Sequence, residues 1–145
     1  FAKMGGMIDI TTGASKYTDP YKSVLYALEK GVLIDNMTFS SDGNAGLDRL
    51  DDNGNLIGFK RAPFDKNLEE VINLVTIGGI PLEKAIKLIT TNPAKNLGLK
   101  NKGYAKVGYD ADLCFFDSSF KLQTVISKGN FVLKDSDLIV KGSFE

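Results

Sequence analysis

Two β-prone segments flank one amphipathic helix in the first forty residues of this chain. Residues 7–12 and 34–41 are rich in β-branched and apolar side chains, whereas the segment between them has Pro20 in its first turn and ends at Gly31. A strand, a helix and a second strand in this order make the two strands parallel, with the helix as the crossover. We therefore expect an α/β fold with a parallel sheet or barrel.

Two further helices are predicted in the middle of the chain. Apolar residues recur three and four positions apart over 64–78, and again in the helix that Pro81 opens. Both stripes are typical of helices packed on a core. Asn92 with Pro93 after it predicts a helix cap followed by one short turn of helix.

The pattern changes from helical to β beyond Lys100. Four short β-prone segments with turn residues between them predict a small sheet or half-sandwich. They are 113–116, 125–127, 131–133 and 138–140. We therefore place a domain boundary near residue 100, with residues 1–100 as one domain and residues 101–145 as a second.

The composition is that of an ordinary globular domain without a strong electrostatic field. The 145 residues include 18 basic and 18 acidic side chains, so no net charge favours nucleic acid or an anionic membrane. No signal peptide and no apolar run long enough to span a bilayer is visible, and the single cysteine, Cys114, lies in an apolar run. We expect a buried thiol, a reducing compartment and a cytoplasmic protein.

Two carboxylates, one in the first predicted strand and one directly after the second, are candidates for the functional site. Asp42 directly follows the second strand, and catalytic groups lie at the C-terminal ends of the strands in (β/α)-barrels. Asp42 is therefore the candidate catalytic residue, the alternative being an acid that caps a loop. Asp9 is the only charge in the first strand, and it is either a site residue or a carboxylate that bonds neighbouring backbone amides.

A long polar segment follows Asp42. Residues 43–63 are rich in Asp, Asn and Gly, with a strong turn signal at 52–55. A long irregular segment directly after a barrel strand is usually a functional loop. We therefore expect this segment to contribute to the site as a loop.

Motifs on both sides of residue 100 carry a resemblance to a known superfamily. They are Thr91-Asn92-Pro93-Ala94, Leu97-Gly98-Leu99, Gly103, Val107-Gly108, Asp110-Ala111-Asp112-Leu113 and Asp117. Together they resemble the closing signature of the amidohydrolase superfamily, in which a barrel ends at an Asn-Pro-Ala turn and the chain crosses into a small β domain. In this resemblance Asp110 and Asp112 organise the crossing.

Segments elsewhere narrow the resemblance. Gly6–Thr11, Thr38–Asn44, Asp52–Leu56 and Val140–Glu145 together resemble the isoaspartyl (β-aspartyl) dipeptidase family. The resemblance implies the C-terminal portion of such an enzyme: the last two strands and helices of a (β/α)8 TIM-like barrel, followed by part of a small β-sandwich domain. The chain opens on Phe1 and contains no histidine, and in this family the metal-binding histidines lie on earlier strands. We therefore expect the chain to be part of a longer protein.

The resemblance also implies a mechanism. In that mechanism a hydroxide would bridge two divalent metals, usually zinc, which would also polarise the scissile carbonyl. Asp42 ligates one metal, takes the hydroxide's proton and delivers it to the departing amine. Gly43, Asn44 and Gly46 are candidate substrate-binding residues, although a plain turn also explains the first two. Family members have Gly-Ser where this chain has Ala45-Gly46, so the serine hydroxyl near the substrate's α-carboxylate is absent.

One function is favoured and two alternatives stay open. The favoured function is zinc-dependent hydrolysis of β-aspartyl dipeptides by the full-length enzyme, with this chain alone inactive and without a complete metal site. The alternatives are an amidohydrolase acting on a cyclic amide or an N-acyl substrate, and a non-catalytic assembly protein with the same fold. Strand edges and apolar helix faces left exposed in such a fragment predict association with the missing N-terminal part or a homo-oligomer.

Overall fold

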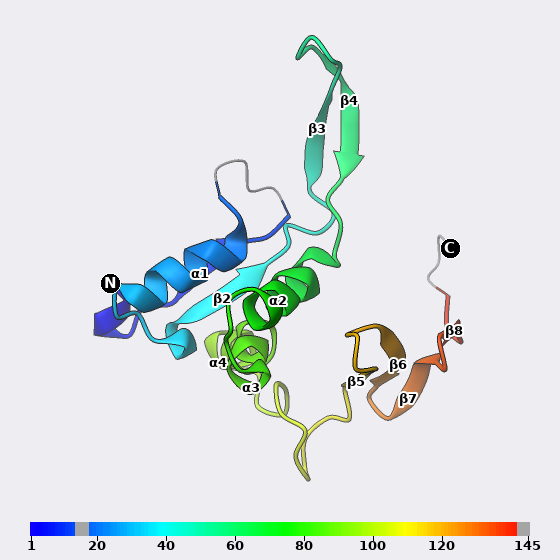
Figure 1. Ribbon diagram of the computed structural model, residues 1–145. Helices are drawn as coiled ribbons and strands as arrows, with labels where there is room; N and C mark the ends of the chain where they lie inside the picture. The colour runs from blue at the N-terminus through cyan, green and yellow to red at the C-terminus, as the bar shows by residue number, and fades with distance from the viewer. Residues whose placement is uncertain (14–17, 142–145) are drawn as a thin grey trace.

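Two parallel strands form the centre of the N-terminal part of the chain. The computed structural model describes residues 1–13 and 18–141 (Figure 1). Strand β1 (Ile8–Thr11) pairs in parallel with β2 (Met37–Ser40), and α1 (Pro20–Glu29) lies between them in the chain. The predicted strand-helix-strand order with parallel strands is confirmed.

Short 3₁₀ turns precede both strands. They are η1 (Ala2–Met4) before β1 and η2 (Ile34–Asn36) before β2. The sequence predicts a strand from residue 34, and this boundary is wrong by three residues. The chain instead closes a turn there, in which the Asn36 N–H donates to the Leu33 carbonyl at 3.0 Å.

One face of the β1–β2 pair is covered by helices. With α1, these are α2 (Lys66–Thr76), α3 (Leu82–Ala85) and the 3₁₀ helix η3 (Ile86–Ile89) (Figure 1). The buried side chains of this core are Val24, Met37, Phe39, Val71, Leu74, Ala85 and Leu88. The predicted apolar stripes contribute to the core in part: Val71 and Ala85 are buried in it, whereas Leu82 is exposed. The helix after Pro81 is shorter than predicted and tightens into η3.

A buried carboxylate on α2 closes the N-terminal end of α1. The Glu70 side chain is buried, and its Oε2 accepts a hydrogen bond from the Tyr21 N–H at 2.8 Å. Its Oε1 accepts a second from Asn73 Nδ2 at 3.2 Å. Tyr21 lies in the first turn of α1, where N–H groups have no partner within the helix and the helix dipole favours negative charge. Glu70 thus ties α1 to α2.

The Asn-Pro-Ala motif ties the last helix of this part to the beginning of β2. In α4 (Thr91–Asn96), Asn92 is 2% exposed and its Nδ2 donates to the carbonyl oxygens of Ile34 and Met37, both at 2.8 Å. The prediction of Asn92 as a helix cap is wrong, because the residue lies inside the helix. Its side chain satisfies backbone carbonyls of another segment instead of an N–H of its own helix.

We expect Asn92→Ala to destabilise the chain strongly. The substitution removes a donor from the buried Met37 carbonyl and from the partly buried Ile34 carbonyl. A lost hydrogen bond to a buried group costs roughly 1–3 kcal/mol, so the free energy of unfolding falls by about 2–4 kcal/mol. Urea unfolding followed by circular dichroism measures this change. Asn96→Ala, at the exposed end of the same helix, is the matched control, and equal losses in the two variants would contradict the assigned role.

The segment 43–63 forms a hairpin and not an irregular loop. Strands β3 (Gly46–Leu50) and β4 (Leu56–Arg61) pair antiparallel and project from the rest of the structure (Figure 1). Asp51 stabilises the connection because its Oδ1 accepts hydrogen bonds from two backbone N–H groups of the turn, at 2.9 and 2.8 Å. The turn predicted at 52–55 is therefore confirmed, and the prediction of a long irregular loop is wrong.

The last part of the chain forms one antiparallel sheet. Its strands, paired in chain order, are β5 (Leu113–Phe116), β6 (Leu122–Ser127), β7 (Asn130–Lys134) and β8 (Asp137–Leu138). The predicted small sheet is present, and residues 142–145, which contribute to the family resemblance, lie outside the described residues. None of the described helices is long and apolar enough to cross a membrane. The cytoplasmic location stays a prediction.

An ion-pair cluster holds the segment that leads into this sheet. Lys102 Nζ lies 2.8 Å from Asp110 Oδ2 and also contacts Asp112. Asp112 Oδ1 accepts a hydrogen bond from the Lys128 N–H at 2.7 Å. Mainly because of its hydrogen bond with Lys102, the pKa of Asp112 lies below its usual value. Both aspartates therefore have structural partners, in line with the role that the resemblance implies.

Asp117 organises the turn between β5 and β6. Its Oδ1 accepts hydrogen bonds from the hydroxyl and the N–H of Ser119, at 2.6 and 2.9 Å, and from the Lys121 N–H at 3.0 Å. These bonds, the Ser119 hydroxyl first, lower the pKa of Asp117. A carboxyl with a lowered pKa in the folded state stabilises the fold above its unfolded pKa, and this contribution is lost as the pH falls through the folded pKa.

We therefore expect Asp117→Asn to weaken the acid sensitivity of the sheet. The wild-type chain loses the Asp117 contribution below about pH 4, the unfolded pKa of an aspartate. The variant lacks the titrating group, so its urea midpoint falls less than that of the wild type between about pH 5 and about pH 2. Urea unfolding at intervals of about one pH unit measures this difference. Asp137→Asn in β8 is the control. A variant with the same pH dependence as the wild type would contradict this assignment.

Candidate functional site

The C-terminal ends of β1 and β2 lie together and are tied to α2. Thr12, directly after β1, is buried, and its N–H donates to the Ser40 carbonyl at 2.7 Å. Its Oγ1 donates to Asn67 Oδ1 at 2.7 Å. Sequence reasoning missed both Thr12 and Asn67. They are 55 residues apart, and no local pattern marks a contact over that separation.

Asp42 lies just beyond this strand end. Its backbone is left-handed (φ 49°), a conformation that aspartate tolerates better than most residues, and its side chain is exposed. Its carbonyl accepts a hydrogen bond from the Ala45 N–H at 2.9 Å, which closes a turn. Within the described residues, the Asp42 carboxylate has no hydrogen bond or ion pair. No described residue therefore occupies this carboxylate.

The three candidate substrate-binding residues lie at the base of the hairpin. A side chain at Gly43 would overlap the Phe64 ring, because its Cβ would be 2.2 Å from Cε1. Asn44 is left-handed (φ 68°) and donates its N–H to the Ala62 carbonyl at 3.2 Å. Gly46 is the first residue of β3. Packing and the turn account for Gly43 and Asn44, and contact of all three with a substrate stays a prediction.

Asp9 bonds hydroxyl side chains of the neighbouring strand and not backbone amides. Its Oδ1 accepts a hydrogen bond from Thr38 Oγ1 at 2.6 Å, and its Oδ2 accepts one from Ser40 Oγ at 2.5 Å. The register explains this pairing, because Asp9 lies opposite Thr38 and Ser40 is two residues further along β2. The predicted alternative, a carboxylate on backbone amides, is therefore wrong.

The described residues do not by themselves fit a complete metal site. Among residues 1–13 and 18–141, no group of three or more His, Cys, Asp or Glu side chains is placed to hold a metal ion. Asp42 can supply one carboxylate, while both oxygens of Asp9 already accept hydrogen bonds. Zinc sites in proteins take three or four protein ligands. A metal at Asp42 would therefore need further ligands from outside these residues.

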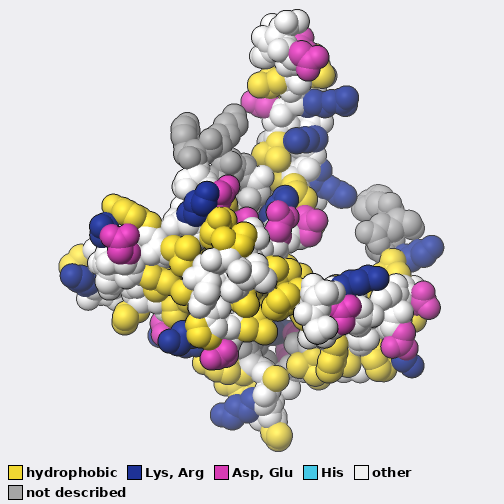
Figure 2. Space-filling model, viewed as in Figure 1, with side chains coloured by type: hydrophobic (Ala, Val, Ile, Leu, Met, Phe, Trp, Pro, Cys, Tyr) yellow, Lys and Arg dark blue, Asp and Glu magenta, His cyan; other side chains and the backbone are white. Residues whose placement is uncertain are grey.

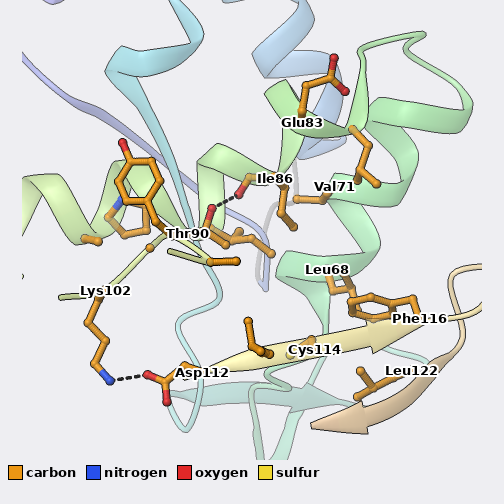
Figure 3. Close-up of a pocket in the computed structure, with 18 of the residues that line it drawn as sticks. Leu68, Val71, Glu83, Ile86, Thr90, Lys102, Asp112, Cys114, Phe116 and Leu122 are labelled. Carbon is orange, nitrogen blue, oxygen red and sulfur yellow. Dashed lines mark hydrogen bonds and ion pairs between the residues drawn. The ribbon is translucent and has the colours of Figure 1, made fainter. Parts of the chain in front are cut away.

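An apolar groove lies away from Asp42, between the helices and the C-terminal sheet. It encloses about 1140 Å³, and its lining includes Leu68 and Ile86 on the helix side and Phe116 and Leu122 on the sheet side (Figure 3). Asp42 is not among the lining residues. Figure 2 shows hydrophobic side chains gathered over the middle of the visible face, where α2 and α3 lie. The groove and the strand end are therefore separate features.

Cys114 lines this groove and is exposed, so the prediction of a buried thiol is wrong. Cys114 lies in β5, one of the two edge strands of the described sheet, where fewer neighbours cover a side chain. The partial burial that remains raises the pKa of the thiol. A raised pKa keeps the thiol protonated at neutral pH, which disfavours a role as a nucleophile.

Comparison with known proteins identifies the family. The sequence profile of the amidohydrolase family matches residues 2–132. The chain belongs to the amidohydrolase family. An adenine deaminase of Methanothrix thermoacetophila is 32% identical over 80 residues, and one of Methanosphaera stadtmanae is 33% identical over 82 residues. Each match covers 55% of this amidohydrolase chain and 14% of the deaminase.

Solved structures of other enzymes share the fold. The β-aspartyl dipeptidase of Fervidobacterium islandicum AW-1, in complex with the β-Asp-Leu dipeptide, is 36% identical with a TM-score of 0.81. The match covers 98% of this chain and 37% of the dipeptidase chain. An N-acetylglucosamine-6-phosphate deacetylase of Pasteurella multocida, 23% identical with a TM-score of 0.63, shares the fold over 86% of this chain and 36% of its own. The present amidohydrolase chain thus spans little more than a third of these relatives.

We expect Gly13→Ala to disturb the strand end that precedes Asp42. A Cβ at Gly13 would lie 2.0 Å from the Ser41 carbonyl oxygen, which is backbone and cannot rotate away. Overpacking of this kind costs about 1–3 kcal/mol of unfolding free energy. Gly46→Ala, whose Cβ would have only one neighbour at 4.0 Å, is the control in the same urea assay. Equal stability of the two variants would show that the Ser41 carbonyl oxygen does not lie against Gly13.

Proposed function

We propose that this chain is part of a metal-dependent hydrolase of β-aspartyl dipeptides. The observation that carries the proposal is the likeness to the Fervidobacterium islandicum dipeptidase, which extends over 98% of the chain at 36% identity. That dipeptidase was crystallised with β-Asp-Leu. The adenine deaminases match only 55% of the chain, so they support the family more than the substrate.

The architecture belongs to the same proposal. Residues 1–100 would form the C-terminal portion of a (β/α)8 barrel, with β1 and β2 as its last two strands. Residues 101–145 would form part of a small β-sandwich domain. The parallel pairing of β1 and β2, the helices on one of their faces and the change to an antiparallel sheet after residue 100 support this division.

In this proposal Asp42 is the proton-transfer group. Its carboxylate accepts a proton from the water that attacks the scissile amide and returns the proton to the departing amine. Its place two residues after the end of β2, its exposure and its lack of a partner among the described residues suit that role. Gly43, Asn44 and Gly46 follow it in the chain and would approach the substrate through their backbone.

The proposed cofactor is a pair of zinc ions, with Asp42 as one ligand. The other ligands would come from outside this chain, because the described residues hold no group of three suitable side chains. We therefore expect the 145-residue chain alone to bind no zinc tightly and to be inactive. Zinc retained through gel filtration of this chain, measured by mass spectrometry, would contradict the proposal.

Exposed apolar surface supports association with a further part of the protein or with another copy. Val107 is 99% exposed and Leu97 is 71% exposed, and the groove between the helices and the sheet is apolar. Surfaces of this kind are uncommon on a finished monomer. Either partner would cover them, and the mass of the longer protein in solution distinguishes a monomer from a homo-oligomer.

We expect Asp42→Asn in the longer protein to lower kcat for β-Asp-Leu by about 10²–10⁴-fold, the usual contribution of a positioned acid-base group. Asparagine keeps the shape but cannot accept the proton. Release of leucine measures the rate, and Asp52→Asn in the hairpin turn is the control.

Two outcomes would contradict the proposal in different ways. An Asp42→Asn enzyme with wild-type kcat would reject the role of Asp42. A wild-type enzyme that releases no leucine but hydrolyses a cyclic amide or an N-acyl substrate, or deaminates adenine, would reject the substrate and keep the family. No turnover of any of these substrates would favour a non-catalytic assembly protein.

A further inference from the structure

Asp9 is a carboxylate on a strand face that the core does not use. Its neighbours Ile8 and Ile10 pack against the buried cluster, and successive side chains of a strand point to opposite faces, so Asp9 belongs to the other face. Its side chain is exposed. Aspartate is disfavoured in strands, and no ion pair among the described residues compensates for it. Neither core packing nor a salt bridge therefore explains this residue.

The two carboxylate oxygens of Asp9 are each used by a hydroxyl of β2. Thr38 Oγ1 donates to one at 2.6 Å and Ser40 Oγ donates to the other at 2.5 Å. Hydrogen bonds to an ionised acceptor are about twice as strong as neutral ones. The carboxylate therefore fixes two alternate residues of β2 relative to β1.

Ser40 is held by hydrogen bonds at both its hydroxyl and its carbonyl group. Its hydroxyl is bonded to Asp9, and its carbonyl accepts the Thr12 N–H at 2.7 Å and the Thr12 hydroxyl at 3.2 Å. Ser40 is the last residue of β2, and Asp42 follows two residues later, where the backbone turns left-handed. The path from Asp9 to Asp42 therefore contains one hydrogen bond and two peptide units.

We propose that Asp9 is a positioning residue that fixes the strand end from which Asp42 departs. This inference rests on the proposed function of Asp42. Asp9 does not touch the reacting atoms in this account; it sets the place of the Asp42 carboxylate. A misplacement of about 1 Å in a catalytic group can cost about 10²-fold in rate. Loss of Asp9 should therefore lower kcat and leave KM nearly unchanged, because substrate binding is not its task.

The test compares Asp9→Ala and Asp9→Asn in the longer protein with β-Asp-Leu as substrate. Alanine removes both acceptors, and we expect kcat to fall by about 10–100-fold with KM within about twofold. Asparagine restores much of the rate, to within about threefold, because its carbonyl accepts from one hydroxyl and its amide donates to the other. A purely structural residue would lower the unfolding midpoint without this split between kcat and KM. Asp9→Ala with wild-type kcat would overturn the proposal.

Two further variants sharpen the result. Asp35→Asn removes an exposed acid that pairs with Lys87, and it should leave kcat unchanged. Ser40→Ala combined with Asp9→Ala should cost no more than Asp9→Ala alone, because the two substitutions break the same bond. Fully additive losses would show that Asp9 does not act through Ser40 and would overturn the proposed path.

Hydrogen exchange separates this inference from the substrate assignment. If the wild-type enzyme releases no leucine, the proposed function fails, and the exchange of the Thr12 amide, which bonds the Ser40 carbonyl, still tests Asp9. In Asp9→Ala we expect the Thr12 amide hydrogen to exchange about fivefold faster than in the wild type, because one supporting hydrogen bond is lost. In Asp35→Asn its exchange rate should equal that of the wild type. Unchanged exchange in Asp9→Ala would reject the inference whatever the substrate.

Discussion

Two hydrogen bonds from the buried amide of Asn92 hold the beginning of β2 against α4. Buried carbonyl groups need a donor, and the Asn92 amide supplies one to the Met37 carbonyl and a second one to the Ile34 carbonyl, which also accepts from the Met37 N–H. Asn92 therefore decides where η2 ends and where β2 starts. Since β2 has only four residues, the place of its first residue also sets the place of its last.

The same helix holds the chain that leaves it. Thr91 Oγ1 donates to the Gly103 carbonyl at 3.0 Å, and Gly103 fits closely because its own Cβ would lie 2.9 Å from that of Ala94. Its φ of 85° also favours glycine. The family motifs in this chain therefore consist of residues that packing and hydrogen bonds require. They fix the scaffold, whereas the chemistry that we propose lies at the opposite end of β2.

At that end, side chains distant in the sequence meet in a way that only the three-dimensional fold determines. Thr12, Asn67 and Ser40 connect both strands to α2. Asp9 holds β2 from the adjacent strand. Asp42 stands beyond these contacts with its own carboxylate unpaired among the described residues. A hydrogen-bonded strand end beneath a carboxylate that no described residue pairs with is the arrangement expected of a preorganised catalytic group.

Local patterns predicted the elements better than their contacts. The order of β1, α1 and β2 and the apolar helix stripes were predictable because periodicity reports burial directly. The hairpin is harder to predict although it has a turn signal, because a segment rich in Asp, Asn and Gly after a barrel strand equally fits an irregular loop. The position of Asn92 inside α4 and the partners of Asp9 were not predictable, since each depends on groups tens of residues away.

The central claim is that the end of β2 is the reacting edge of this amidohydrolase. A crystal structure of the longer protein with β-Asp-Leu bound tests it most directly. We expect the dipeptide at this strand end, with the Asp42 carboxylate within about 3.2 Å of the scissile amide group or connected to it by one water. A dipeptide bound elsewhere, for example in the apolar groove, with Asp42 facing bulk solvent, would contradict the account.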